Sequence, residues 1–227
     1  MGSMLLDIAR RRLRNQQIGR ERFDQPDQVP AWLGAMQAQD YAGVKWAIGL
    51  RCQTASDTNV EQAIADREII RTWLMRGTLQ IVAAEDVRWM VVLLGPRLIK
   101  QSARRRRELG LDDTLLARSS EVLSTVLHGR RQLTRTAVLQ ALEQQGISTV
   151  GQRGYHILRH AGLQGHICFG SMQNKEQTFV LLEEWAPQGQ KKEREEALAE
   201  LAQRYFTSHG PATLEDFVWW SGLTKAD

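Results

Sequence analysis

Residues 69–83 read IIRTWLMRGTLQIVA, and this stretch decides the fold of the first half of the chain. Its second arm alternates, with Thr78 and Gln80 polar and Leu79 and Ile81 apolar. Arg76-Gly77 supplies the residues of a tight turn between the two arms. The pattern predicts a β-hairpin, and the hairpin follows segments with helical periodicity. Three helices and then a hairpin are the element order of a winged helix.

The segments before the hairpin have helical spacing of their apolar residues. Asp27 is a plausible N-cap for a helix that we expect to run to about Met36, with Pro30 in its first turn. Further helices are predicted over residues 44–50 and 59–66. The apolar residues of the first two helical stripes are Leu5, Ile8, Ala9 and Leu13, then Val29, Trp32, Leu33 and Met36.

The same order of elements recurs in the second half of the chain. Helices resume from Ala84 to the arginine run near residue 107. Residues 133–146, LTRTAVLQALEQQG, predict a helix capped by Thr134. Residues 148–162 follow at helix-turn-helix spacing and would form the recognition helix. Strands at 165–170 and 177–183, joined by the polar turn 171–175, would form the second wing.

The last segment begins a third unit of the same kind. A charged stretch at 191–196 leads into a helix through Tyr205, and GPATLEDFVWWSGL (210–223) starts another helix-turn-helix pattern. We therefore expect a fragment of a longer protein. The predicted fold class is mainly α with small β-hairpin wings (α+β), arranged as tandem winged-helix domains. The predicted domains are a first winged helix at 5–110, a second at 111–187 and the start of a third at 188–227.

Composition places the chain among ordinary globular proteins. It has 227 residues, of which 42% are hydrophobic and 25% charged. No apolar run approaches the length of a membrane span, and no signal-peptide pattern is present, so we expect no membrane association. The two cysteines are far apart in sequence, which favours a reducing cytoplasm.

The net charge of +4 is concentrated in the first half of the chain. Residues 1–110 carry 18 Lys and Arg against 12 Asp and Glu, an excess of six. A positive surface of this kind attracts a polyanion such as nucleic acid. The competing interpretation is a solvated, arginine-rich helix face. Arginine clusters occur at 10–14 and 104–107.

Two motifs were weighed as sites for chemistry and set aside. His156 and His160 lie four residues apart, with His166 and Cys168 after them, but no second ligand pair or glutamate completes a zinc pattern. We therefore expect no metal. Gly-Gln-Arg-Gly at 151–154 lacks the strand and spacing of a phosphate-binding loop.

Four blocks of the sequence resemble the AlkZ/YcaQ family of bacterial winged-helix DNA glycosylases. The blocks are MQAQDYAG (36–43), REIIRTWLMRGTLQIVAAEDVRWM (67–90), the segment from LTRTAVLQAL to GLQGHICFG (133–170) and YFTSHGPATLEDFVWWSGL (205–223). The resemblance implies a DNA-embracing scaffold of tandem winged helices. It also implies excision of N7-alkylated purines, including bulky adducts and interstrand cross-links, by a Gln-hydrophobic-Gln or Gln-hydrophobic-Asp motif.

The family motif maps onto Gln37 and Gln39, with Ala38 as a small central residue. Asp40 lies one position outside the Gln-hydrophobic-Asp register. Side chains two residues apart diverge by about 200° on a regular helix, so the two amides could not address one sugar from an unbroken helix. We therefore expect the helix to end near Gln37 and the backbone to turn, so that both amides face one groove.

Several residues outside this motif are candidate DNA contacts. Many relatives have His at the position of Gln80, which is a departure of this sequence from the family pattern. The hairpin would lie in or beside a groove, whereas its alternative is an ordinary wing. The candidates are Arg76, Thr78 and Gln80 on the hairpin, Arg104 and Arg105 in the arginine run, and Arg153 and Arg159 on the second recognition helix.

Together these observations predict a monofunctional DNA glycosylase that acts on cationic N7-alkylpurines in duplex DNA. It would need no cofactor, work as a monomer and reside in the cytoplasm with the nucleoid. The rival prediction is a non-catalytic winged-helix DNA-binding protein or transcriptional regulator. A protein–protein scaffold is a more distant third.

Overall fold

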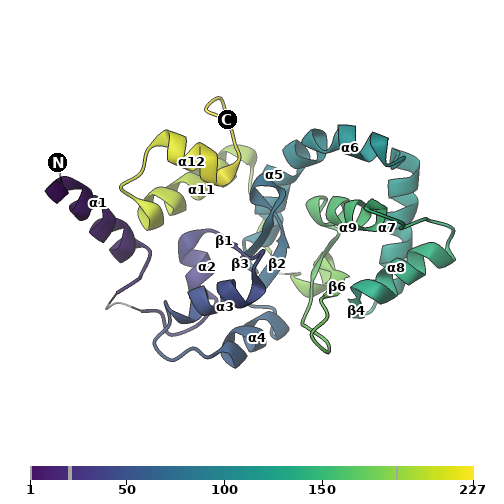
Figure 1. Cartoon of the computed structure of the whole chain (residues 1–227), viewed down its shortest axis with the longest axis horizontal. Coiled ribbons are helices and arrows are strands. Elements are labelled where there is room, and N and C mark those ends of the chain that lie inside the picture. The colour runs from purple at the N-terminus through teal and green to yellow at the C-terminus, as the bar shows by residue number, and fades with distance from the viewer. Residues whose placement is uncertain (1, 20–21, 188) are drawn as a thin grey trace.

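The computed structural model describes residues 2–19, 22–187 and 189–227. It is mainly helical, with a single antiparallel sheet of six strands in the order β1-β3-β2-β5-β6-β4 (Figure 1). The predicted fold class is therefore confirmed. None of the helices in the described ranges is long and apolar enough to cross a membrane.

The first winged-helix module contains the predicted hairpin. Its arms, β2 (Ile69–Trp73) and β3 (Leu79–Ala83), are joined by a 3₁₀ turn, η1 (Met75–Gly77), in which Arg76 has a positive φ of 55°. A short strand, β1 (Met36–Gln37), pairs with β3 at the edge of the sheet. The helices of this module are α1 (Gly2–Asn15), α2 (Gln28–Leu33), α3 (Tyr41–Gly49) and α4 (Asp57–Ala65).

The second module repeats this plan after a long helical connection. The connection consists of α5 (Val87–Gln101) and α6 (Ala103–Glu108). The second hairpin is formed by β5 (Ile167–Phe169) and β6 (Thr178–Leu181). Thr134 caps the helix that begins at Arg135, as predicted. The remaining elements are α7 (Asp113–Leu127), β4 (Leu133–Thr134), α8 (Arg135–Gln144), α9 (Arg153–Leu163) and α10 (Leu182–Trp185).

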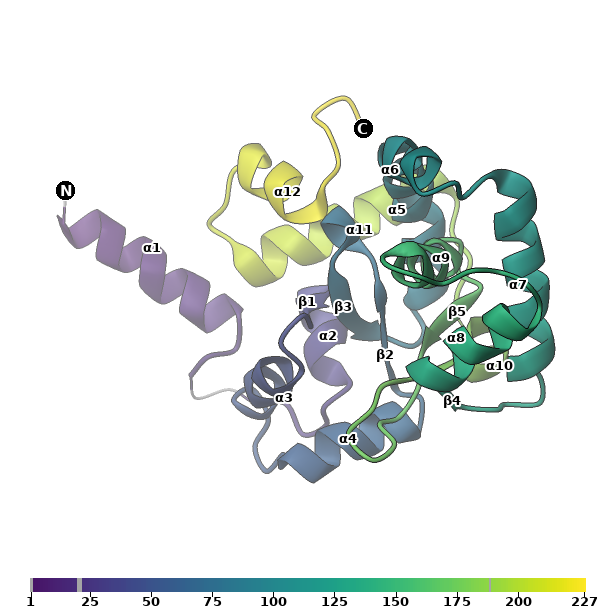
Figure 2. The ribbon, with the colours of Figure 1, turned by 45° about the vertical axis from the view of Figure 1, so that its right-hand side comes forward.

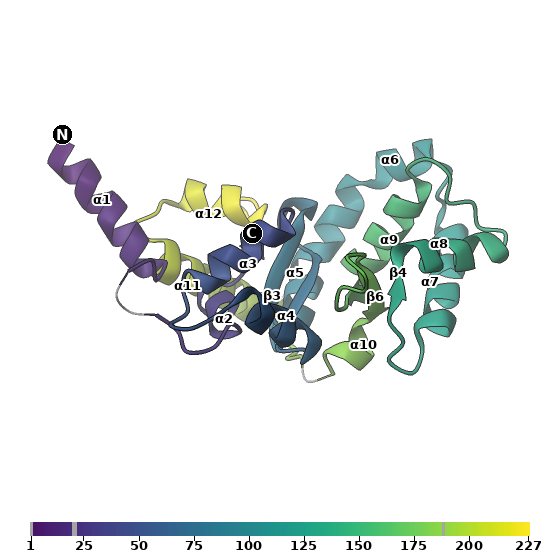
Figure 3. The same cartoon turned by 60° about the horizontal axis from the view of Figure 1, so that its bottom comes forward.

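The two hairpins join into one sheet, because β2 pairs with β5 through Arg71 and Phe169. The sequence patterns predict two separate wings, so the pairing of the two hairpins is a difference from that prediction. Figure 3 shows the resulting elongated shape, with the helices of the first module at one end, those of the second at the other, and the sheet between them.

Three apolar clusters hold these layers together. One covers a face of the first hairpin with α2, α3 and α4, and includes Ala38, Ile48 and Ile81. Another fills the second module around Leu123, Leu142 and Phe169. The third covers the opposite face of the first hairpin, where α5 packs with α11 (Arg194–His209) and α12 (Leu214–Ser221).

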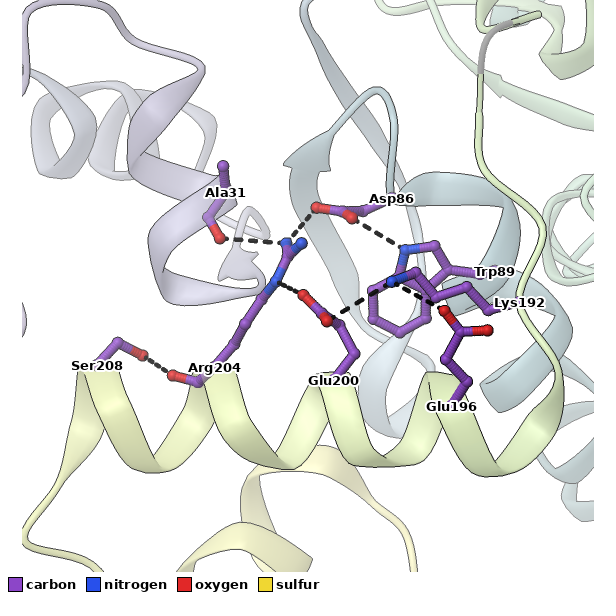
Figure 4. Close-up of polar contacts among 8 residues, drawn as sticks. All are labelled: Ala31, Asp86, Trp89, Lys192, Glu196, Glu200, Arg204 and Ser208. Atoms are coloured by element: carbon purple, nitrogen blue, oxygen red, sulfur yellow. Dashed lines mark hydrogen bonds and ion pairs between the residues drawn. The ribbon is translucent and has the colours of Figure 1, made fainter.

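Helix α11 is fastened to the first module by a polar network (Figure 4). Arg204 pairs with the buried carboxylate of Asp86, and its Nη1 also donates to the carbonyl of Ala31 at 3.2 Å. Asp86 in turn accepts a hydrogen bond of 2.9 Å from the indole of Trp89. Because this network joins α11 to α2 and α5, and Phe217 of α12 lies in the same apolar cluster, α11 and α12 both pack on the first module.

Helix α1 follows the predicted stripe but does not bury it. Leu5 and Leu13 remain 65% and 49% exposed, and the helix reaches away from the body of the molecule (Figure 2). Arg12 at its end donates to the carbonyl of Pro211 at 2.8 Å, which ties the arm to the loop between α11 and α12.

Candidate active site

The chain changes from helix to strand directly before the Gln37-Ala38-Gln39 motif. Helix α2 ends at Leu33, and Gly34 follows with φ of 81°, a conformation that side chains with a Cβ rarely adopt. The expected helix through Met36 is therefore wrong by three residues. Met36 pairs with Ile81 and Gln37 with Gln80, while the amide of Ala38 donates to the carbonyl of Leu79 at 2.8 Å.

Both glutamines are brought to one surface of the molecule. Gln37 lies in strand β1, and Gln39 follows two residues later in a bend. Ala38 is fully buried in the core, whereas Gln37 and Gln39 are exposed. The expected break of the helix is present, and it brings the two amides to one surface.

Both glutamines line a pocket of about 460 Å³. Its floor and walls come from β1, the start of α3 and the ends of α11 and α12. Segments far apart in sequence thus meet around the motif. The residues that line the pocket with the glutamines are Gln16, Leu33, Ala35, Met36, Asp40, Gly43, Val44, Ala47, Arg51, His209 and Trp220.

The two amides have different environments. The Oε1 atom of Gln39 accepts a hydrogen bond of 3.1 Å from the backbone N–H of Leu79, which orients the side chain and leaves a second lone pair and the NH2 group free. The side chain of Gln37 makes no hydrogen bond to another residue in the described ranges. One amide is held and the other is free to bind solvent or DNA.

Two basic side chains of the pocket were not identified from the sequence. Arg51 is 6% exposed, and its Nε and Nη1 donate to the carbonyls of Gln16 and Ala47 at 2.7 and 2.8 Å. His209 stacks on Tyr205 with ring centroids 4.8 Å apart. Burial lowers the pKa of His209 to about 4, and the charge of Arg51 acts in the same direction. The imidazole is therefore neutral at physiological pH.

Asp40 lines the pocket but is already engaged as a helix cap. Its carboxylate accepts a hydrogen bond of 3.0 Å from the backbone N–H of Gly43 and thereby caps α3. A carboxylate at an N-cap accepts hydrogen bonds from the first turn of the helix. Asp40 consequently adds negative charge to the rim of the pocket.

The prediction that Gln80 contacts DNA is not supported by its position. The alternation of β3 suggested an exposed polar side chain, but β1 and β2 flank it in the sheet and leave it 3% exposed. Its Nε2 donates to Thr78 Oγ1 at 2.7 Å. Thr78 itself is half-buried, and its hydroxyl donates to the carbonyl of Met75 at 3.0 Å.

The two predicted arginine contacts nearest the motif meet at the hairpin turn. Arg76 is exposed and stacks over the ring of Trp219 at 4.9 Å, and its Nη1 donates to the Trp219 carbonyl at 3.1 Å. Arg159 of α9 approaches the other side of the turn, with its Nε 3.5 Å from the carbonyl of Gly77. The turn thus connects the glutamine pocket with the recognition helix of the second module.

The other predicted arginines surround the N-terminal end of α9. Arg105 donates to Gln152 Oε1 at 2.8 Å, which joins α6 to the residue before α9. Arg153 is half-buried and donates to the carbonyls of Ser148 and Leu109. Arg104 is 88% exposed and pairs with Glu108 at 3.0 Å. Arg104 and Arg105 are thus at the surface but both pair with Glu108, whereas Arg153 donates to backbone carbonyls.

The histidine and cysteine group of the second module is dispersed. Cys168 is completely buried, and His160 is 7% exposed. His166 Nε2 lies 3.1 Å from the hydroxyl of Ser124. Within the described ranges, no three His, Cys, Asp or Glu side chains are grouped so that they could hold a metal ion.

Comparison with known proteins identifies the family to which the chain belongs. The family model described as "DNA glycosylase AlkZ-like" matches residues 31–227. The chain is 25% identical over 206 residues to an "Interstrand DNA cross-link repair glycosylase" of Streptomyces sahachiroi, a match that covers 85% of this chain and 54% of that protein.

The fold has a counterpart among solved structures. The structure of the Streptomyces sahachiroi DNA glycosylase AlkZ superposes with a TM-score of 0.77 at 22% identity, covering 95% of this chain and 60% of that one. The chain thus spans between half and two thirds of the length of these relatives. Because the family model matches most of the chain, the protein belongs to the AlkZ-like DNA glycosylase family.

Proposed function

We propose that this chain carries the catalytic site of a monofunctional DNA glycosylase that hydrolyses the N-glycosidic bond of cationic N7-alkylpurines in duplex DNA. One observation supports this most directly. Gln37 of the edge strand β1 and Gln39, two residues further on, line one pocket beside the Asp40 carboxylate, the neutral His209 and Arg51, whose guanidinium donates to backbone carbonyls. Family membership supplies the reaction class.

The charge of the substrate explains why amides suffice. An N7-alkylguanine is positively charged, so the electrons of the broken C1′–N9 bond neutralise the departing base and no strong acid is required. Positive charge develops on the sugar instead, and amide oxygens can face it. Gln37, which is free, would orient the attacking water, while Gln39, held by Leu79, would direct its dipole toward C1′. The water oxygen bonds to C1′, and its proton passes to solvent.

The other side chains of the pocket are consistent with these roles of the two glutamines. His209 is neutral and adds no repulsive charge, and Asp40 places a carboxylate on the rim. No lysine is among the residues that line the pocket in the described ranges, so a Schiff base with the sugar has no candidate there. The expected product is an abasic site with an intact strand.

The proposed substrates extend from methyl adducts to bulky adducts and interstrand cross-links. The printed name of the Streptomyces sahachiroi relative supports the last of these. Extruding a cross-linked base from the stack is costly, so we propose that the site accepts a lesion still in or near the stack. The partner would be duplex DNA bound by a monomer, without a cofactor.

The test is excision from a duplex containing N7-methylguanine, followed by alkali to reveal abasic sites. We expect Gln37→Ala and Gln39→Ala each to slow single-turnover excision by about 100-fold, with DNA affinity little changed. Gln101→Ala, at the exposed end of α5, is the matched control and should behave as wild type.

The same assay distinguishes the glycosylase from a non-catalytic protein. Salt-sensitive DNA binding by wild type without excision would favour a non-catalytic DNA-binding protein, and an absence of DNA affinity at low salt would favour a protein–protein scaffold. Unchanged excision in the double variant would remove the glutamines from the mechanism.

A further inference from the structure

A buried guanidinium holds the peptide between the two glutamines. Arg71 of β2 is 3% exposed, and its Nε and Nη2 atoms donate to the carbonyl of Ala38 at 3.2 and 2.8 Å. In the described part of the chain, no carboxylate lies within ion-pair distance of Arg71. Removing an arginine from water without a carboxylate partner is costly, so this placement calls for an explanation.

Two aromatic rings enclose the guanidinium. The Cζ atom of Arg71 lies 4.9 Å from the ring centre of Tyr41 and 5.0 Å from that of Phe169. Tyr41 begins α3, whereas Phe169 comes from β5 of the second module. The residue therefore sits where both modules and the glutamine motif meet.

The Tyr41 ring that faces Arg71 also belongs to a cluster of charged side chains. The Tyr41 hydroxyl donates to Glu61 at 2.7 Å, and Lys45 pairs with both Glu61 and Asp57, at 2.7 and 2.9 Å. The two carboxylates and one ammonium leave one surplus negative charge. The electron-rich face of the Tyr41 ring attracts the guanidinium. Burial lowers the pKa of Arg71 from its ordinary value, and within the described residues no carboxylate competes with Ala38 for its donors.

We propose that Arg71 is the positioning residue of the glutamine motif: its guanidinium fixes the Ala38 peptide so that Gln37 and Gln39 both face the pocket. The inference rests on the proposed function of those glutamines. Strand β1 has only two residues, and Ala38 lies just beyond it. The Ala38 N–H, in the peptide that follows Gln37, donates to Leu79, and the Ala38 C=O, in the peptide that precedes Gln39, accepts from Arg71, so each of the two peptides between the glutamines is held by one hydrogen-bond partner.

The alternative is that Arg71 only stabilises the core, and kinetics separates the two. Without the guanidinium, the buried carbonyl loses its donors and the peptide turns to find water, which carries both amides with it. Arg71→Met should then slow single-turnover excision of N7-methylguanine by about 100-fold, the cost of misplacing a catalytic group by about 1 Å. The Kd for duplex DNA should stay within about twofold, because Arg71 is buried and touches no DNA.

Arg88→Met is the control for this experiment, and Arg71→Lys is the conservative variant. Arg88 also uses its guanidinium to hold a backbone carbonyl, that of Ala186 at 3.0 Å, beside α10 and away from the glutamine pocket. Arg88→Met should lower thermal stability without slowing excision. Arg71→Lys keeps the charge and one donor, so its excision rate should fall between wild type and Arg71→Met, and it serves if the methionine variant does not fold.

A second measurement does not depend on activity. The N–H of Leu79 donates to Gln39, so its hydrogen exchange, followed by NMR, reports on that side chain. We expect exchange at Leu79 to accelerate at least about tenfold in Arg71→Met or Arg71→Lys, but not in Arg88→Met. If wild type shows no excision, the proposed function fails while the exchange at Leu79 still decides the role of Arg71.

Three results would overturn the inference. They are unchanged exchange at Leu79 in both Arg71 variants, an excision rate that falls only in proportion to lost folded protein, and faster excision in Arg71→Met. The last would mean that the charge of Arg71 opposes the developing sugar cation more than its geometry helps.

Discussion

Ala38 is the residue on which the geometry of the motif depends. It is fully buried against the core of the first module, and both its N–H and its C=O are hydrogen-bonded. A close-packed interior leaves no room for added methylene groups at such a position. The small side chain is therefore what lets β1 lie close to β3 with the glutamines outward.

We expect Ala38→Leu to destabilise the protein by about 1–3 kcal/mol, because the larger side chain overpacks the core and pushes β1 from β3. Excision should fall more steeply than stability. The free energy of unfolding from denaturant titration and the single-turnover rate test this together. Ala42→Leu, on the exposed side of α3, is the control. Equal behaviour of the two variants would show that the site tolerates displacement of β1.

The sequence predicted correctly that a helix ends before Gln37 and that both glutamines reach one surface. Their catalytic role stays a prediction. Met36 continued the apolar stripe of α2, so periodicity extended the helix too far, whereas the positive φ of Gly34 ends it. Arg51 and His209 could not be found, because only the folded chain brings them to the motif.

At the scale of elements, the contact between α5 and α9 joins the two modules. Gly95 of α5 lies against the backbone carbonyl of Leu163 at the end of α9, and a Cβ there would collide with it. Gly162 lies against the ring of Trp73 in the same way. Two glycines thus allow the helices and the first hairpin to approach closely.

Gly95→Ala should destabilise the protein although alanine favours helices. The gain in helix propensity is about 1 kcal/mol, while the collision with an immobile backbone carbonyl costs about 1–3 kcal/mol. Gly49→Ala is the matched comparison, since the nearest atom to its Cβ would be the Ala55 carbonyl at 3.5 Å, an ordinary contact. Thermal unfolding should separate them, with a lower Tm for the first only. A Tm for Gly95→Ala at or above that of wild type would contradict the close packing.

Periodicity and turn signals predicted most elements but not their joints. Both hairpins and α8, α9, α11 and α12 lie where the patterns placed them, apart from shifts at their ends. Helix α7 was not identified from the sequence. The pairing of β2 with β5 was also missed, because a register between strands almost 100 residues apart leaves no local signal.

Across the whole molecule, two imidazoles, the buried His160 and the half-buried His209, couple stability to pH. His209 lies at the pocket of the first module and His160 in the second. Burial lowers the pKa of each to about 4, and the Arg106 charge assists at His160. Folding therefore favours the neutral form of both side chains.

Acidification should destabilise the protein before its carboxylates titrate. A histidine pKa that is lower in the folded than in the unfolded chain stabilises the fold above the unfolded value of about 6.5, and this contribution is lost as the pH falls toward 4. We expect the Tm to fall between pH 7 and pH 5, with uptake of up to two protons on unfolding. His160→Asn should reduce that slope, and His128→Gln, which changes an 81% exposed side chain, is the comparison. A Tm independent of pH over this range would contradict the prediction.

The register of strand β1 on β3 decides which side chains near the glutamine motif are exposed. The strand lies at the edge of the sheet and has two residues, so its alignment with β3 alone decides which side chains meet the solvent. Deleting one residue between Gly34 and Met36 would shift the register by one residue. Ala38 would then face the solvent, and both amides would face the apolar core. Substitutions at positions 37 and 39 therefore leave the side chains at these positions in place. Insertions or deletions between α2 and β1 would displace them.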